Sequence, residues 1–441
     1  MTAPLWAPLL VAAIALVWSA TSVVGFVEAL ALLWTIGLGL AAVGLRYPRL
    51  GLVGIGLLCS LHGFAAPLLL RGGLWRWNTV NYLLFVMTFL FWPYLLGVGK
   101  SQSRVLLALI ALLGLEILLS PDPQDGIQHV FSVVAVFGLL VYVGRATLDP
   151  DLWYWLGVVT GVSAAVGTAA FLLQQGRLPF VNPNAWSYVP LTAVFAISLA
   201  FVVTGGARGR GPVLGLLATI NGLWVFLSGS RGSILTAAVC LTFLFTLMQL
   251  RRALWFGMVA ALLSVVILSQ FTALRERAVG RLGLLADRNQ SLTVRTSGRF
   301  DLALGAWHMF QDHPFGLGTG GFRANWVDYV ADTRAREGSS QFQLKHSHLA
   351  AHSAWMKILV ENGFPGIVLL GAYVFSFAVS GWSTRDPVLR KLGLTVSAVL
   401  AVAWISTEFW NPGLWLLAAG ATVLIDRYSL RRLSASAHSI A

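Results

Sequence analysis

Long uninterrupted apolar runs constrain this chain more than any other feature of its sequence. Each run approaches the roughly 20 residues that an α-helix needs to cross a bilayer. Hydrophobic residues make up 57% of the 441 residues, whereas charged residues make up only 11%. The runs are continuous and rich in Leu, Ala and Val rather than alternating, which favours helices over the strands of a barrel. The sequence therefore predicts an all-α polytopic membrane protein.

Hydropathy leads us to expect about 12 (12–14) transmembrane helices. The candidate spans are residues 5–20, 24–45, 51–70, 78–98, 104–120, 127–144, 152–174, 187–205, 211–228, 231–249, 253–271, 365–382, 392–409 and 412–426. The first run has no Lys or Arg ahead of it, which predicts a retained helix rather than a cleaved signal peptide. Cys59 and Cys240 both lie in apolar segments, so no disulfide framework is expected.

Lys and Arg in the short loops predict the orientation of the chain. One alternating set of loops holds most of them, namely Arg46, Arg49, Lys100, Arg104, Arg145, Arg208, Arg210, Arg251, Arg252, Arg385, Arg390, Lys391, Arg427, Arg431 and Arg432. The other set holds only Arg71, Arg76, Arg177 and Arg231. We expect the first set to be cytoplasmic, with both termini inside and an even number of spans.

The segment from residue 272 to 351 is far longer than the other connections and falls on the outer side. Long loops escape the positive-inside rule, so its basic character leaves the orientation unchanged. A long loop in a chain of tight connections indicates a function. The expected organisation is an N-terminal transmembrane bundle (1–271), an outer loop domain that ends in a histidine-bearing helix (272–364), and C-terminal transmembrane helices with a short cytoplasmic tail (365–441).

Arginines concentrate at the start of this outer loop, against only Glu276 and Asp287. They are Arg275, Arg277, Arg281, Arg288, Arg295 and Arg299. The planar guanidinium matches phosphate oxygens with a fork of donors. A basic pocket beside the bilayer suits a lipid-linked phosphate or pyrophosphate. The alternative for any single arginine is a solvated face, or a side chain that reaches to lipid headgroups.

Residues 296–322, "TSGRFDLALGAWHMFQDHPFGLGTGGF", predict a short amphipathic helix followed by a glycine-rich turn. An apolar stripe at helical spacing consists of Phe300, Ala303, Leu304, Trp307 and Phe310. We expect this stripe to pack on the membrane surface. The glycines at 316–321 lack the preceding strand and the spacing of a nucleotide-binding loop, so a tight turn is expected there.

Three histidines lie in "HSHLAAHSAWMKILVENGFPG" (346–366). Asn362-Gly363 is a helix C-cap signature and Pro365 suits the first turn of a following helix, so residues 348–362 are predicted to form a separate outer helix. His348 and His352 share one helix face. Zinc needs at least a third protein ligand, so His346 and His348 are interpreted as structural and no metal or other cofactor is expected.

Three segments resemble those of a known family. "HSAWMKILVENGFPG" resembles the His-[Asn/Ser/Gln]-x9-Gly signature of bacterial O-antigen ligases, through His352, Ser353, Gly363 and Gly366. "LSGSRGSILT" (227–236) is similar to the Ser-Arg-Gly segment common to O-antigen ligases and polymerases. Residues 297–322 are similar to the region that precedes the histidine motif in the same superfamily. The resemblance covers about residues 220–370, and O-antigen polymerases and protein O-oligosaccharyltransferases share much of it.

The resemblance implies a GT-C-like glycosyltransferase of the bacterial inner membrane with a periplasmic active site. Such a ligase moves a glycan from undecaprenyl diphosphate to the sugar end of lipid A–core. Membrane lipids are the other expected partners, and nucleic acid is not one. The enzyme alternatives use a second lipid-linked glycan (a polymerase) or a protein as the acceptor. A flippase or transporter is the non-enzyme alternative, but transporters often show repeated halves, and we find no internal repeat in this sequence.

The expected chemistry gives the candidate residues their roles. Charge builds on the diphosphate as the glycosidic bond breaks, and fixed positive donors lower that barrier. The only Asp-x-Asp, at 149–151, is interpreted as a cytoplasmic helix start, so we expect arginines to replace a metal. The candidates are Arg231, Arg288, Arg295 and Arg299. His352 is expected to assist the acceptor hydroxyl, and Glu408, near the outer end of its span, is the alternative base.

Overall fold

The structure is a computed structural model with an all-helical architecture. It describes residues 50–56, 100–118, 133–140, 150–175, 183–204, 209–248, 250–270, 299–326, 353–407 and 411–438, with short pieces at 47, 59, 120–121, 130, 143–144, 149, 276–280, 283, 287, 289–290, 295–296 and 328–329. Over these residues no strand occurs. The all-α prediction is confirmed for this part of the chain.

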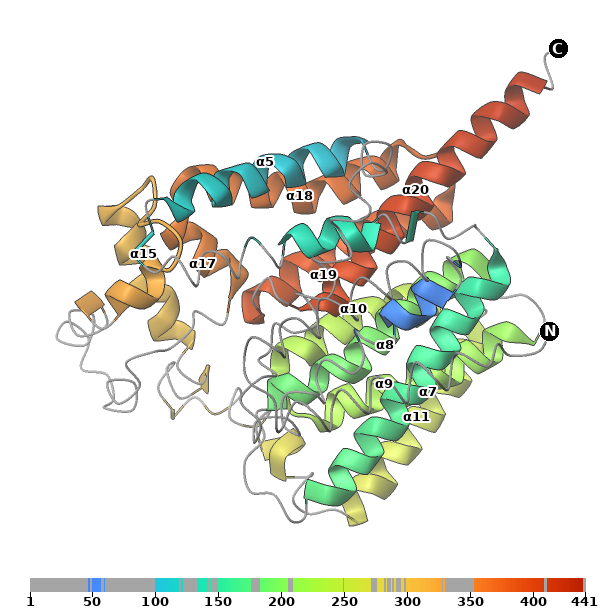
Figure 1. Cartoon of the computed structure of the whole chain (residues 1–441). Coiled ribbons are helices and arrows are strands. Elements are labelled where there is room, and N and C mark those ends of the chain that lie inside the picture. Colours follow the sequence, from blue (N-terminus) through green and yellow to red (C-terminus); the bar gives the residue numbers. More distant parts are fainter. Residues whose placement is uncertain are drawn as a thin grey trace, which may run out of the picture.

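The longer helices are distributed along the chain from residue 100 to residue 438 (Figure 1). They are α5 (Lys100–Ile117), α7 (Pro150–Gln175), α8 (Pro183–Thr204), α9 (Arg210–Leu227), α10 (Arg231–Leu247), α11 (Leu250–Gln270), α15 (Arg299–Asp312), α17 (Ala354–Glu361), α18 (Gly363–Ser383), α19 (Pro387–Ser406) and α20 (Pro412–His438). A five-residue π-helical turn, η2, covers Glu276–Gly280.

Five helical segments of the described chain are long and apolar enough to cross a membrane. They are Pro150–Ala169, Ser187–Thr204, Arg210–Leu227, Gly363–Ser383 and Pro387–Ser406. Shorter apolar helices cover Arg231–Leu247, Leu254–Gln270 and Pro412–Asp426. All of these coincide with predicted spans, which supports a polytopic membrane protein. The predicted spans at 5–20, 24–45 and 78–98 lie outside the described residues, so the total of about 12 spans stays a prediction.

Proline sets the start of several helices. Pro150, Pro183, Pro387 and Pro412 are the first residues of α7, α8, α19 and α20. The fixed φ angle of proline suits the first helical position, where the missing N–H would have had no partner in the helix. The carboxylate of Asp386 also caps α19 by accepting from the backbone N–H of its second residue at 2.8 Å. These local signals place the helix boundaries within the apolar runs.

Helix α8 forms the centre of the bundle. Within its apolar stretch 94% of the residues are buried, against 33% for α18. Helices α7, α9, α10 and α20 pack around α8, while α19 packs between α18 and α10. Helix α5 lies along α18 (Figure 1). The helices that are distant in sequence therefore pack through α8 and α19, and α18 presents much of its surface outward.

Helix α19 ends earlier than its predicted span of 392–409. The helix stops at Ser406, and Thr407 has an extended backbone with φ −133° and ψ 156°. The backbone carbonyl of Thr407 accepts a hydrogen bond from the N–H of Ala354 at 2.9 Å. Hydropathy had placed Thr407 inside the span, but its carbonyl bonds to the first residue of α17. The predicted end of the span at residue 409 was therefore wrong.

The boundary between α17 and α18 agrees with the prediction. Helix α17 ends at Glu361, Asn362 has φ −113° and ψ −2°, and Gly363 begins α18 with φ +59°. The predicted outer helix over 348–362 was wrong at its start, because Ser353 has an extended backbone with φ −149° and ψ 122° and caps a helix that begins at Ala354. Residues 348–352 lie outside the described residues, so the shared helix face of His348 and His352 stays a prediction. The glycine turn is confirmed as well, because Gly316, Gly318 and Gly320 all have positive φ angles.

Candidate functional site at the helix ends

The first turn of α17 is attached to the last turn of α19. Ser353 is the N-cap of α17, and its hydroxyl accepts from the N–H of Met356 at 3.3 Å. The same hydroxyl donates to the backbone carbonyl of Trp404 at 3.0 Å. Ala354 adds the bond to Thr407 described above. The side chain of the predicted signature serine and the backbone of the residue after it are thus both bonded to the end of α19.

The start of α10 meets the same helix end. A Cβ atom added to Gly232 would lie 1.8 Å from the hydroxyl oxygen of Ser406, so only a glycine allows this approach. Three helix ends therefore converge, and we call this place the helix-end junction. It comprises Ser230–Gly232 at the start of α10, Ser353–Ala354 at the start of α17 and Ser406–Thr407 at the end of α19.

Serine hydroxyls connect the junction to the central helix. The hydroxyls of Ser187 in α8 and Ser233 in α10 lie 2.8 Å apart, and the hydroxyl of Ser230 donates to that of Ser233 at 3.0 Å. All three side chains are buried. Because buried polar groups are costly unless hydrogen-bonded, this network fixes how α10 begins against α8. The Ser-Arg-Gly segment is thereby held on the most buried helix of the bundle.

Two of the predicted arginines come together beside the junction. Arg231 is the first residue of α10, and its guanidinium donates to the backbone carbonyl of Arg295. Arg299, the first residue of α15, donates its backbone N–H to the carbonyl of Thr296 at 3.3 Å. The side chains of all three arginines are half-buried. Arg288, His352 and Glu408 lie outside the described residues, so their predicted roles stay predictions.

Glycines allow the end of α17 to pack closely against the glycine turn. Phe364 donates its N–H to the carbonyl of Pro314 at 2.8 Å. A Cβ on Gly363 would lie 2.3 Å from that same carbonyl oxygen, and a Cβ on Gly316 would lie 2.3 Å from the carbonyl oxygen of Glu361. Backbone thus packs directly on backbone. This requires glycine at the predicted signature position 363 for both its φ angle and its missing side chain.

The second signature glycine has a packing role. A Cβ on Gly366 would lie 2.3 Å from the Cβ of Asn362 and 2.8 Å from a methyl carbon of Ile358. Gly366 therefore lets the first turn of α18 pack against the last turn of α17. Both predicted glycines shape the connection between these two helices.

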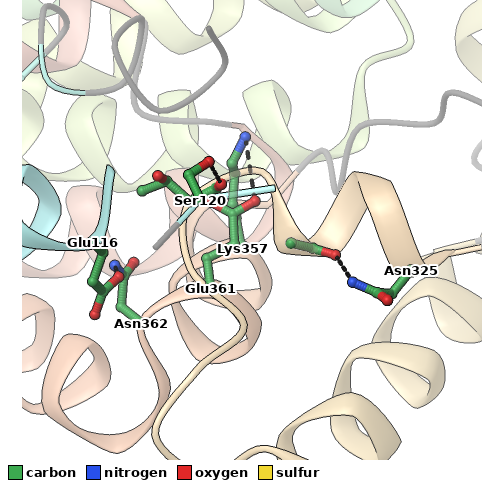
Figure 2. Close-up of polar contacts among 8 residues, drawn as sticks. Glu116, Ser120, Asn325, Lys357, Glu361 and Asn362 are labelled. Atoms are coloured by element: carbon green, nitrogen blue, oxygen red, sulfur yellow. Dashed lines mark hydrogen bonds and ion pairs between the residues drawn. The ribbon is translucent and has the colours of Figure 1, made fainter. Parts of the chain in front are cut away.

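A buried polar cluster lies at the end of α17, and sequence reasoning gave its members no role beyond that of Asn362 in the helix C-cap signature. Lys357 and Glu361 form an ion pair at 3.7 Å, with side-chain exposures of 8% and 2%. The amide of Asn362 donates to the carboxylate of Glu116 near the end of α5 (Figure 2). Ser120 donates to the backbone carbonyl of Thr319 in the glycine turn. The spacing of four residues between Lys357 and Glu361 was a readable signal. Asn362 was predicted only as a helix C-cap, and nothing local pointed to its contact with Glu116.

The contact between Glu116 and Asn362 leads to a testable prediction. Asn362→Asp places a second carboxylate against that of Glu116 in a buried position. We expect the mutant to lose stability by about 1–3 kcal/mol, because the amide donor is lost and one of the two carboxyl groups must take up a proton to avoid like-charge repulsion. Adding Glu116→Gln should restore most of the loss, since the new amide donates to the new carboxylate. The thermal unfolding midpoints of the purified single and double mutants test this.

Glu116→Gln alone is the matched control for this pair. Its amide oxygen still accepts from Asn362, so the single mutant should stay close to the starting protein. A double mutant as unstable as Asn362→Asp would contradict the proposed donor and acceptor assignment.

The Asp-x-Asp at the start of α7 has the structural role that the sequence predicted. Pro150 begins α7, and the side chain of Asp149 accepts from the N–H of Asp151 at 3.0 Å. The carboxylate of Asp151 forms an ion pair with Arg210, whose guanidinium also lies 5.1 Å from the ring centre of Tyr154. These carboxylates serve a helix start and a contact between α7 and α9.

The fold and the junction together define the class of this protein. It is a polytopic α-helical membrane protein in which arginine, serine and glycine residues gather where the ends of α10, α17 and α19 meet. Residues 214–371 match the family model described as O-Antigen ligase, which supports the O-antigen ligase family for this chain. A comparison with curated proteins found no match.

The match contains much of the site but not all of it. Arg231, Arg295 and Arg299 lie within residues 214–371, as do α17 and both signature glycines. The end of α19 and the end of α5 lie outside it. The family supports a function of the O-antigen ligase or polymerase type, and thus a glycosyltransferase-like membrane enzyme of lipopolysaccharide biosynthesis.

Proposed function

We propose that the protein is an O-antigen ligase. It transfers a glycan from undecaprenyl diphosphate to the lipid A–core oligosaccharide at the periplasmic face of the inner membrane. The chain carries its outer loop domain between two sets of membrane helices, with both termini cytoplasmic. In this proposal the residues that act on the substrates are Arg231, Arg288, Arg295, Arg299 and His352, with Glu408 as a second candidate base.

The helix-end junction is the observation that carries this proposal. Gly232 packs on Ser406, and Ala354 bonds to Thr407 at 2.9 Å. Along the chain, Arg231 adjoins Gly232, His352 lies two residues before Ala354, and Glu408 follows Thr407. The candidate phosphate-binding arginine and both candidate bases therefore lie within two positions, along the chain, of residues that contact one another at the junction. This supports a common site for the departing diphosphate and the incoming hydroxyl.

The proposed reaction needs one bond formed and one bond broken. The acceptor hydroxyl oxygen attacks the anomeric carbon of the glycan, and the bond from that carbon to the diphosphate oxygen breaks. The diphosphate leaves with the electron pair, and its added charge is stabilised by guanidinium groups. His352 takes the hydroxyl proton, a role suited to an imidazole near neutral pH. The lipid diphosphate is already an activated donor, so the step requires no nucleotide.

Arginines supply the positive charge in this mechanism. In the described part of the chain, the Asp-x-Asp that a metal-dependent transferase would use is a helix start in which Asp151 pairs with Arg210. Arg231 is half-buried and oriented by the carbonyl of Arg295. A guanidinium carries five N–H donors in a planar fork that matches phosphate oxygens. This arrangement supports phosphate binding by the arginines.

The distinguishing experiment uses purified protein in vesicles with undecaprenyl-diphosphate-linked glycan and purified lipid A–core. We expect the glycan to become joined to the core. Lengthening of the lipid-linked glycan without core modification would instead establish a polymerase. Glycan movement across the vesicle membrane without a new bond would overturn the enzyme proposal.

Replacement of Arg231 by lysine tests the diphosphate role. Arg231→Lys keeps the charge but loses the planar fork of donors. We expect the transfer rate to fall at least about tenfold, by analogy with the loss of one transition-state donor. Arg323→Lys is the matched control, because Arg323 is an exposed arginine of the outer loop domain. Equal rates for the two mutants in the vesicle assay would contradict a phosphate-binding role for Arg231.

A further inference from the structure

Helix α15 has apolar residues on both of its faces. One face, with Leu302, Ala306 and Met309, packs in a small core together with Trp326 and Val360. The opposite face is the predicted apolar stripe, and it stays outside this core.

The outward face carries large aromatic side chains. Phe300 is 38% exposed and Trp307 is 48% exposed. The rings of Trp307 and Phe310 lie 5.6 Å apart between centroids, so they form one aromatic surface. Such contiguous apolar exposure is unusual on a water-facing surface and marks a contact with lipid or a partner.

The turn after α15 is attached to the beginning of a membrane span. Phe364 is the second residue of α18, and its N–H donates to the carbonyl of Pro314 at 2.8 Å. Phe315, the next residue, is 81% exposed, and Phe364 is 62% exposed. The hydrogen bond fixes Pro314 and Phe315 at the level of the first turn of α18. An exposed phenylalanine at that level lies at the boundary of the bilayer.

The exposed apolar surface continues along α18 itself. Val368, Phe375, Val379 and Trp382 on this helix are each between 48% and 64% exposed. Since α18 is long and apolar enough to cross a membrane, these residues face lipid. The aromatic surface of α15 and its turn is thus joined, through Phe364, to a surface that lipid already covers.

We propose that α15 and Phe315 form a membrane-contacting element that lies in the outer boundary of the bilayer, with phospholipid as its occupant. Trp and Phe are the residues that membrane-surface helices insert at this depth. The buried face of α15 packs on Val360 of α17, so the element also sets the height of α17 relative to the bilayer. That last consequence rests on the proposed function, because it places the motif helix at the level of a lipid-linked diphosphate.

Spin labels on single cysteines test this proposal without an activity assay. Cys59 and Cys240 are free and buried, and both are replaced by alanine. Labels are then placed at Trp307 and Phe315 in the full chain, reconstituted in phosphatidylcholine and phosphatidylglycerol vesicles. Arg323 provides a water-exposed control, and Phe375 on α18 provides a membrane control.

We expect labels at 307 and 315 to collide with oxygen more than with a water-soluble nickel chelate, as the label at 375 does. The label at 323 should show the opposite preference. Labels at 307 and 315 that match the one at 323 would overturn the proposal. The proposal would also be overturned if labels at 307 and 315 collided with neither oxygen nor the nickel chelate and showed dipolar broadening between labels. A second copy of the chain would then cover this face. The Phe315 label replaces a side chain with few protein contacts, so it remains informative if Trp307→Cys fails to fold.

Discussion

Alanine in place of His352 should reduce glycan transfer to the background of the assay while the protein stays folded. The imidazole is the group that we expect to accept the proton of the attacking hydroxyl, and loss of a general base lowers a rate by about 10²–10⁴-fold. Transfer in the reconstituted vesicles gives the rate, and thermal unfolding of the purified mutant verifies the fold.

His346→Ala and His348→Ala are the matched controls, since both remove a histidine from the same stretch of seven residues. We expect them to retain transfer. If His352→Ala makes product at nearly the normal rate, the histidine has no part in the chemistry. Loss of transfer in Glu408→Gln would then identify the carboxylate as the base.

Alanine at Gly363 should unfold or severely destabilise the region around α17. Gly363 has φ +59°, and an added Cβ would lie 2.3 Å from the carbonyl oxygen of Pro314. The left-handed conformation and the backbone clash together cost on the order of 3 kcal/mol. We expect a lower unfolding midpoint and loss of transfer in the same mutant.

The control for this mutant is Gly371→Ala within α18. No atom lies within 4 Å of a Cβ added to Gly371. Alanine also has a higher helix propensity than glycine by about 1 kcal/mol, so this mutant should be at least as stable as the starting protein. Equal midpoints for the two mutants would show that Gly363 is not required by the turn.

Local sequence signals predicted the helices and their breaks well. Apolar runs located the membrane-spanning helices that the structure describes, and the Asn362-Gly363 pair located the break between α17 and α18. The glycines after Pro314 predicted a turn, and positive φ angles are found there. These features depend on residues close together in the chain, which is why a single sequence reveals them.

Long-range contacts were not predictable in the same way. Glu116 and Asn362 are 246 positions apart, and Ser120 and Thr319 are 199 apart. No periodic pattern in the sequence predicts such pairs, because their contacts depend on how the end of α5 packs against the start of α18 and against the glycine turn. The end of α19 was misplaced for the same reason, since the bond from Ala354 to Thr407 competes with continuation of the helix.

Helix α15 shows a further limit of periodicity. Its sequence contains two apolar faces, one with Phe300 and Trp307 and one with Leu302, Ala306 and Met309. Hydrophobic spacing alone cannot say which face the protein covers. The structure buries the second face, in a small core with Trp326 and Val360.

The anchoring of Ser353 on Trp404, together with the bond from Asn362 to Glu116, has a consequence for engineering. Residues 214–371 alone match the family model, yet α17 is bonded to α19 through Ser353, and Asn362 at its end is bonded to α5. A fragment cut at those limits would leave the serine and the asparagine without their partners. Chimeras that exchange substrate preferences between relatives therefore need to transplant all three segments as one unit.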